Sequence, residues 1–286
     1  MNEKVKIIAL TGPTATGKTA LAVKLAREFN AEIISVDSRQ VYRGMDLGTG
    51  KDLAEYEEIP FHLIDIADPA AEEYNLSCFC HDAFQAIADI TSRGKLPLLC
   101  GGTPLYMTAI LKSYRLPGGA LPHHSSGLPR ERQNPDGEFS FVPPFEIEPL
   151  VLGVYFPRKT VHERIEKRLD ARFAAGMCNE VKKLHEEQGV SWEKLEFFGL
   201  EYREISRYLQ GAATFDEMRY TLLCRIRQFA KRQDIFFRKM EREGIPLRWL
   251  NEGNMQEAQE LISRFLNGKE LPEITFRMSE TFYGKR

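Results

Sequence analysis

The chain has 286 residues, of which 43% are hydrophobic and 28% charged, and its formal net charge is −2. This size suits one large domain or two smaller ones, and the charge balance excludes nucleic-acid binding that relies on the whole chain rather than on a local basic face. No apolar run approaches the roughly 20 residues of a membrane helix. Five scattered cysteines, an odd number, are typical of a reduced chain without a disulfide framework. We therefore expect a cytoplasmic protein without a membrane contact.

Short apolar runs alternate with amphipathic stretches through the first 111 residues. The runs predicted as strands are Val5–Thr11, Glu32–Val36, Phe61–Asp65 and Leu96–Cys100. The stretches with helical spacing are Lys18–Phe29, Cys78–Arg93 and Leu105–Leu111. This alternation predicts an α/β fold in which helices flank a parallel sheet on both faces.

The composition changes between Arg115 and Pro149. This segment contains seven of the fifteen prolines and shows little hydrophobic periodicity. We interpret it as a connector. Beyond it the predicted elements are a strand, a mainly helical part, a strand and a closing helix: Val151–Tyr155, the region from Pro157 to the long helix Phe215–Glu243, Ile245–Leu250 and Gln256–Leu266. The predicted domains are residues 1–114 as the α/β core, 115–149 as the connector, 150–268 as the strand and helices that complete the core, and 269–286 as a tail.

A phosphate-binding loop follows the first predicted strand. Its sequence fits G-x-x-x-x-G-K-[ST] at every fixed position, between a strand and a helix as that motif requires: Gly12, Pro13, Thr14, Ala15, Thr16, Gly17, Lys18 and Thr19. The glycines let several N–H groups face one point, Lys18 adds a full charge, and the Thr19 hydroxyl suits a Mg²⁺ ion that bridges two phosphates. The usual ligand of such a loop is ATP or GTP, but a diphosphate leaving group fits the same cradle.

Two more polar positions follow strands at the same predicted edge, where ligands of parallel sheets collect. Asp37 follows the second strand, where it either caps a helix or has an active-site role, as a metal ligand or as a proton acceptor. Thr103 follows Gly101 and Gly102 after a later strand. Its hydroxyl is suited to a phosphate oxygen or to a helix cap.

The long predicted helix carries a concentration of basic residues. Between Arg219 and Arg242 there are eight cations against Asp234 and Glu241. Arg227 and Lys231 share one face, and Arg225 and Arg232 share another. Such a face is either solvated or directed at phosphates, of a leaving group or of a nucleic-acid backbone.

With these residues in place, the chain resembles the tRNA dimethylallyltransferase family, also called tRNA isopentenyltransferases. The matching motifs occur in the family's order and cover most of the chain outside the connector: Gly12–Thr19, Asp37–Gly44, Gly48–Lys51, His62–Asp65, Gly101–Tyr106, Gly199–Glu204 and Arg227–Arg238. The phosphate loop alone is unspecific, whereas the combination is highly specific.

The resemblance implies transfer of a dimethylallyl group from dimethylallyl diphosphate to the exocyclic amine of the tRNA adenosine 3′ of the anticodon, with Mg²⁺ as cofactor. In such an enzyme the phosphate loop holds the diphosphate. Asp37 matches the general base, Thr103 a threonine near the reacting centre, and Arg227 an arginine on the diphosphate. The segment of Ser38, Arg39 and Gln40 matches the part that holds the target nucleotide. The cations expected to meet tRNA are Arg225, Lys231 and Arg232, and we expect a monomer.

Two departures from the family pattern stand out. The family usually has Gly where this chain has Pro104, which is harmless at the first turn of a helix. The family also carries a helical insertion that grips the anticodon stem-loop, where this chain has the connector of residues 115–149. We expect that insertion to be shortened or replaced.

The missing insertion keeps other functions open. The first alternative is the same transfer onto a free adenine nucleotide, as in adenylate isopentenyltransferases, which lack the insertion. A small-molecule kinase needs only the phosphate loop. A decayed paralogue would bind RNA or phosphate without turnover, although the complete set of Lys18, Asp37, Thr103 and Arg227 argues against decay.

Overall fold

The computed structural model describes residues 4–71, 74–112 and 143–281. Its centre is one sheet of parallel strands in the order β3-β2-β4-β1-β5-β6. The strands are β1 (Val5–Thr11), β2 (Ala31–Ser35), β3 (Phe61–His62), β4 (Leu96–Gly101), β5 (Ile147–Tyr155) and β6 (Arg248–Asn251). The α/β fold predicted from the alternation of elements is therefore confirmed.

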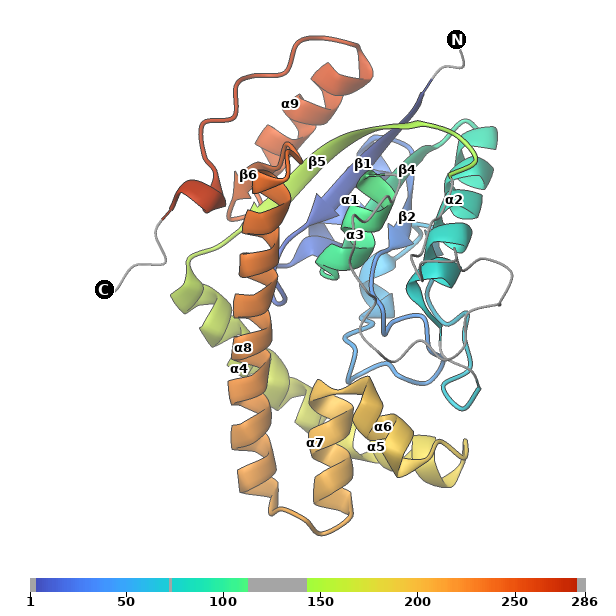
Figure 1. The fold of residues 1–286 in the computed structure, drawn as a ribbon, viewed down its shortest axis with the longest axis vertical. Coiled ribbons are helices and arrows are strands. Elements are labelled where there is room, and N and C mark those ends of the chain that lie inside the picture. The colour runs from blue at the N-terminus through green and yellow to red at the C-terminus, as the bar shows by residue number, and fades with distance from the viewer. Residues whose placement is uncertain (1–3, 72–73, 113–142, 282–286) are drawn as a thin grey trace, which may run out of the picture.

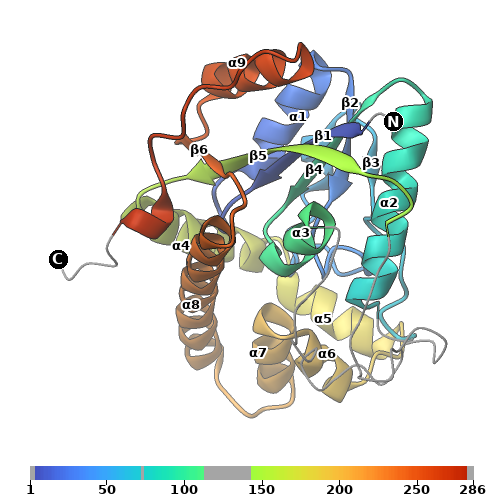
Figure 2. The ribbon, with the colours of Figure 1, turned by 45° about the horizontal axis from the view of Figure 1, so that its top comes forward.

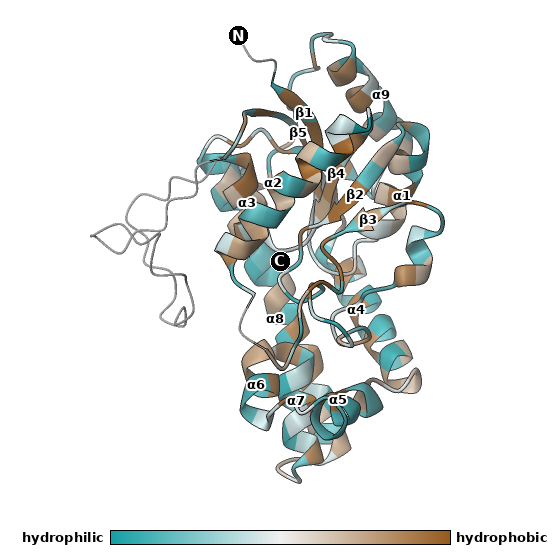
Figure 3. Cartoon of the chain, turned by 90° about the vertical axis from the view of Figure 1, so that its right-hand side faces the viewer, coloured by the Kyte–Doolittle hydropathy of each residue, from teal (hydrophilic) through white to brown (hydrophobic). Residues whose placement is uncertain are grey.

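Helices cover both faces of this sheet (Figures 1 and 2). Leucines and other apolar residues of α1 (Lys18–Glu28) and α9 (Met255–Leu266) pack on one face. On the other face lie α2 (Leu76–Ser92), α3 (Pro104–Leu111) and the C-terminal half of α8 (Phe215–Arg242). Figure 3 shows mostly hydrophobic colours on β1, β2 and β4 and both hydrophilic and hydrophobic residues on the helices. This is the pattern of a sheet buried on both faces.

A helical part packs beside the carboxyl ends of the strands. Its helices are α4 (Arg158–Ala174), α5 (Met177–Glu186), α6 (Trp192–Phe198), α7 (Leu200–Leu209) and the N-terminal half of α8. They share an apolar cluster with Val41, Tyr42 and Met45, which belong to the loop after β2. The long helix α8 thus joins the sheet to the helical part (Figure 1). None of the described helices combines the length and apolar character that a membrane crossing requires.

Two predicted strands are shorter in the structure. The strand predicted over Phe61–Asp65 is only Phe61–His62, because Leu63 and Asp65 have φ values of 64° and 55°. Such left-handed backbone cannot continue a strand. The last strand begins at Arg248 rather than at Ile245. The short 3₁₀ turns Leu53–Tyr56 and Met278–Glu280 complete the described elements.

The predicted connector ends earlier than expected. β5 begins at Ile147, so the last three residues assigned to the connector are strand. The sheet tolerates Pro149 because β6 pairs with β5 only from Leu152 onward, which leaves this part of the strand at an edge. Residues 113–142 lie outside the described residues. The expectation that the family's insertion is shortened or replaced falls mostly on these residues and stays a prediction.

The predicted tail is packed against the core as far as Thr281. Met278 is buried, and the Glu241 carboxylate accepts hydrogen bonds from the N–H groups of Met278 and Ser279 at 3.1 and 2.6 Å. Pro104 lies in the first turn of α3, as expected, where a helix needs no N–H from it.

Candidate active site

A cavity of about 800 Å³ opens where three strands end. The phosphate loop (Gly12–Thr19) follows β1, Asp37 follows β2, and Thr103 follows β4. The facing wall comes from α4, α7 and α8 of the helical part. The cavity therefore lies at the carboxyl edge of the sheet, as the sequence predicted, and between the sheet and the helices.

The phosphate loop has the backbone that its glycines allow. Gly12 has a φ of 148°, and an added Cβ would lie 2.7 Å from the Val154 carbonyl oxygen, so only glycine fits there. Lys18 and the Thr16 hydroxyl both donate to the Pro13 carbonyl, at 2.7 and 2.8 Å. Six residues of this loop line the cavity: Thr14, Ala15, Thr16, Gly17, Lys18 and Thr19. Gly12 and Pro13 shape the loop from behind.

Gln233 of α8 joins two of the loops at the sheet edge. Its Oε1 accepts from the Thr14 N–H at 2.9 Å, and its Nε2 donates to the Gly102 carbonyl at 2.5 Å. An added Cβ at Gly102 would lie 2.9 Å from that Nε2. The side chain is buried, so it fixes the phosphate loop relative to the segment that carries Thr103. This role of Gln233 was not predicted from the sequence.

Asp37 sits at the cavity with one oxygen held in place. Its Oδ1 accepts from the N–H groups of Arg39 and Gln40 at 2.8 and 3.3 Å. Burial raises the pKa of Asp37 above its ordinary value, while these two N–H groups and the nearby Arg39 and Lys18 charges oppose the rise. The carboxyl thus has the local turn bonding of a cap and also the shifted pKa of a group suited to proton transfer.

Thr103 occupies the N-cap position of α3, but its side chain makes no capping bond there. Instead its hydroxyl oxygen accepts from the Ser38 N–H at 3.4 Å, and both residues line the cavity. Arg39 and Gln40 also line it. The two polar positions predicted to meet at the strand ends are therefore brought together.

The basic residues of α8 divide between two faces of the helix. Arg225 and Arg232 line the large cavity. Lys231 instead lines a second cavity of about 270 Å³, behind Pro13. Arg225 is paired with the buried Glu204 at 2.6 Å, whereas Arg232 is exposed.

The structure does not bring Arg227 to the large cavity. About 200° of helix rotation separate it from Arg225, and its guanidinium pairs with Glu166 of α4 at 2.7 Å. A contact with diphosphate would require Arg227 to leave Glu166. In the structure Arg227 links α8 to α4 through this ion pair.

Three arginines of α4 supply the positive wall that the sequence analysis missed. Arg164, Arg168 and Arg172 recur every four residues, so they share one face, and all three line the cavity. Arg168 donates to the Thr14 hydroxyl at 2.5 Å. Burial, helped by the nearby Arg172 charge, lowers the pKa of Arg168 to about 10. Their four-residue spacing was the signal available in the sequence.

Replacing Arg168 with Gln should weaken the binding of inorganic diphosphate. A hydrogen bond to a charged group contributes about 1.5–3 kcal/mol, so the Kd should rise about 10–150-fold. Calorimetric titration measures this Kd directly. Lys167→Gln is the matched control, because Lys167 is exposed on the same helix and is not among the described residues that line the cavity. Equal Kd values for the two variants would remove Arg168 from the anion site.

A Mg²⁺ ion fits the residues at this site. Thr19 lines the cavity, as do its neighbour Lys18 and Asp37. Within the described part of the chain, no group of three or more His, Cys, Asp or Glu side chains could hold a metal by itself. Mg²⁺ commonly keeps few protein ligands and takes its others from phosphates and water. The Thr19 hydroxyl would then hold the ion against a bound phosphate group.

Models of known families match most of the chain. The model described as IPP transferase matches residues 40–139 and 123–240, and the one described as isopentenyl transferase matches residues 5–59. A relative named tRNA dimethylallyltransferase 1 from Syntrophus aciditrophicus is 41% identical over 88% of this chain and 95% of its own length. Another of that name, from Geotalea uraniireducens, is 42% identical over 90% of this chain and 96% of its own. The chain belongs to the tRNA dimethylallyltransferase family.

Solved structures of the family have the same fold. A tRNA isopentenylpyrophosphate transferase of Staphylococcus epidermidis superposes with a TM-score of 0.75 at 28% identity, over 93% of this chain and all of that one. A eukaryotic dimethylallyltransferase described as acting on tRNA gives a TM-score of 0.78 at 22% identity, over 94% of this chain and 81% of that one. The resemblance found in the sequence motifs is thus confirmed.

Proposed function

We propose that this protein transfers a dimethylallyl group from dimethylallyl diphosphate to the exocyclic N6 amine of the tRNA adenosine 3′ of the anticodon. One observation carries the proposal. Six phosphate-loop residues and Asp37 line the same cavity, in a chain of the tRNA dimethylallyltransferase family. An anion cradle and a proton acceptor are the two functions that this reaction needs.

The transfer forms a bond from the adenine nitrogen to the allylic carbon and breaks the bond from that carbon to the diphosphate oxygen. Lys18 and Arg168 stabilise the charge that develops on the leaving diphosphate. Asp37 accepts the proton that the amine loses, which matters because an aromatic amine is a weak nucleophile. Bound Mg²⁺ would neutralise part of the diphosphate charge. The adenine must leave its stack to enter the cavity.

The acceptor is tested by competition between an anticodon stem-loop and AMP. With labelled dimethylallyl diphosphate, kcat/KM for an adenosine-containing stem-loop should exceed that for AMP. Faster modification of AMP would replace the tRNA assignment with transfer to a free nucleotide. A parallel incubation with labelled ATP tests phosphoryl transfer, and phosphorylated product would favour a kinase.

Diphosphate binding should depend on the protonation of Lys18. Burial, helped by the nearby Arg168 charge, lowers the pKa of this amine to about 8. The anion needs the protonated amine, so affinity should be full below pH 8 and should fall as pH rises through about 8. Titrations of inorganic diphosphate across this range measure the dependence. The inflection should vanish in Lys18→Met, and an unchanged inflection in that variant would assign it to another group.

Arg232 should contribute to the salt dependence of tRNA binding. Each phosphate neutralised in single-stranded nucleic acid adds about 0.7 to the slope of log K against log salt. Arg232→Ala should therefore flatten the slope by up to about that amount. Lys231→Ala, on the other face of α8, is the matched control and should change it less. Equal slopes for Arg232→Ala and the unmodified protein would show that Arg232 meets no phosphate.

A further inference from the structure

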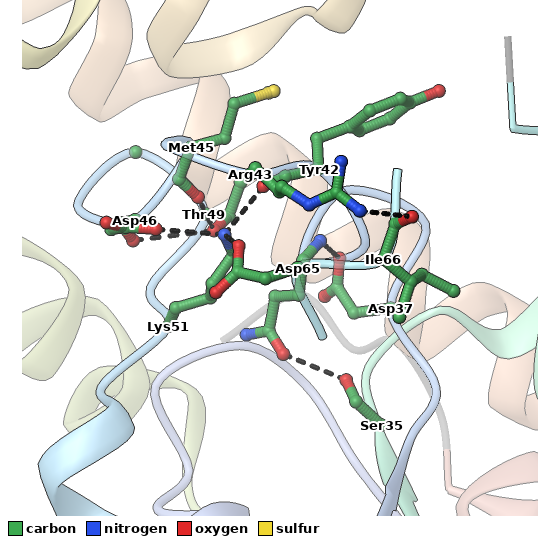
Figure 4. Close-up of polar contacts among 12 residues, drawn as sticks. Ser35, Asp37, Tyr42, Arg43, Met45, Asp46, Thr49, Lys51, Asp65 and Ile66 are labelled. Carbon is green, nitrogen blue, oxygen red and sulfur yellow. Dashed lines mark hydrogen bonds and ion pairs between the residues drawn. The ribbon is translucent and has the colours of Figure 1, made fainter. Parts of the chain in front are cut away.

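Lys51 is a buried cation outside the cavity wall. Its side chain has no exposed area, and its ammonium donates to the Tyr42 carbonyl at 2.6 Å, to Asp46 Oδ1 at 2.9 Å and to the Asp65 carboxylate. Figure 4 shows these three bonds converging on one nitrogen. All three ammonium donors are used. Removal of this cation would leave the Tyr42 carbonyl and the two partly exposed carboxylates without their shared partner.

Glu180 of α5 holds the same loop from the opposite side. Its carboxylate accepts from three successive N–H groups, those of Asp46, Leu47 and Gly48, at 3.0, 2.6 and 3.0 Å. It also accepts from the Tyr202 hydroxyl at 2.8 Å. The helical part therefore grips the loop of residues 46–51 through one carboxylate.

The loop of residues 46–51 packs so closely against the helical part that two of its positions have no space for a side chain. An added Cβ at Gly48 would lie 2.6 Å from the Tyr202 ring. At Gly50 it would lie 1.9 Å from the Arg172 guanidinium. Both glycines line the large cavity, so this loop is part of the wall, held by α4, α5 and α7.

A short chain of hydrogen bonds joins this loop to Asp37. The Gln40 side chain donates from Nε2 to the Gly50 carbonyl at 3.1 Å and accepts at Oε1 from the Ser35 hydroxyl at 2.9 Å. The Gln40 N–H in turn donates to Asp37 Oδ1. Figure 4 draws the Ser35 bond and the Asp37 side chain in the same view as the Lys51 bonds. A movement of the Gly50 backbone would therefore displace the Asp37 carboxyl through the hydrogen bonds of Gln40.

We propose that Glu180 and Lys51 are positioning residues for Asp37, an inference that rests on the proposed function. They fix the loop of residues 46–51 from two sides. The Gln40 side chain is bonded to this loop at Gly50, and its N–H is bonded to Asp37. The position of the loop therefore determines the orientation of the Asp37 carboxyl. Neither residue is among the described residues that line the cavity. The helical part thus sets the geometry of the proton acceptor as well as closing the cavity.

Steady-state kinetics of Glu180→Ala test the proposal. A displacement of about 1 Å at a reacting group can reduce a rate by roughly a hundredfold. We expect kcat for prenyl transfer to fall by about 10–100-fold, while KM for dimethylallyl diphosphate stays within about twofold, because the phosphate loop and Arg168 keep their own contacts. Glu180→Gln keeps one acceptor oxygen and should restore part of kcat. Glu186→Gln, exposed on the same helix, is the matched control.

Hydrogen exchange gives a second measurement, which also covers Lys51→Met if that variant turns over too slowly to assay. Peptides spanning residues 38–50 should exchange faster in Glu180→Ala and Lys51→Met, while the peptide of residues 12–19 should not change. An unchanged kcat in Glu180→Ala, or unchanged exchange of residues 38–50 in both variants, would overturn the inference and leave the proposed function standing. An unmodified protein that transfers no prenyl group would overturn the proposed function and the inference with it.

Discussion

Lys18→Ala should reduce prenyl transfer by more than about a hundredfold, the loss that follows when one donor to a developing anion is removed. The fold should survive, because the Lys18 amine bonds within its own loop, to the Pro13 carbonyl. Tm should therefore move by no more than about 4 °C, the shift that roughly 1 kcal/mol produces in a chain of this size. Turnover under saturating substrate, with a melting curve of the same sample, measures both quantities.

Lys24→Ala is the control for Lys18→Ala, since Lys24 is exposed on the same helix, α1. Near-normal turnover of Lys18→Ala with a clean melting curve would remove the phosphate loop from the reaction. Inorganic diphosphate should also displace a labelled ligand from the unmodified protein at lower concentration than ATP does. A preference for ATP would favour the kinase alternative.

Asp37→Asn should lower the single-turnover rate by about 10²–10⁴-fold, the usual contribution of a positioned base. Diphosphate binding should change little. Because burial raises the pKa of Asp37 and the base must be ionised, the rate of the unmodified protein should rise with pH through a pKa above that of an ordinary Asp. In Asp37→Asn this rise should disappear.

Asn is an informative replacement because its side-chain oxygen can still accept from the Arg39 and Gln40 N–H groups that now bond to Asp37 Oδ1. A residue that only caps this turn would tolerate the exchange. Survival of most of the single-turnover rate in Asp37→Asn would therefore assign Asp37 a structural role, and the proton acceptor would have to be sought elsewhere in the cavity.

Local patterns sufficed for the features that depend on neighbours in the sequence. The phosphate loop was readable because its glycines, its strand and the start of α1 are adjacent in the chain. The length of β3 could not be predicted, since the residue types of Leu63 and Asp65 do not indicate their left-handed backbone. The role given to Arg227 came from motif matching alone, and the motif does not reveal that Glu166 of α4 pairs with it.

Long-range contacts set the rest of the site. Arg168 reaches Thr14 across 154 positions, and Gln233 reaches the Thr14 N–H across 219. Glu180 grips a loop more than 130 positions earlier in the chain. Such pairs depend on how the helical part docks beside the sheet. Of these three contacts, only that of Arg168 had a local signal in the sequence, the four-residue spacing of the α4 arginines.

The proposed function is tested most simply by product analysis after the protein is incubated with Mg²⁺, dimethylallyl diphosphate and unmodified tRNA. We expect one dimethylallyl group on N6 of the adenosine 3′ of the anticodon, found by nuclease digestion and mass spectrometry, with one diphosphate released per modified tRNA. A modified AMP with unmodified tRNA, or diphosphate release without any prenylated adenosine, would contradict it.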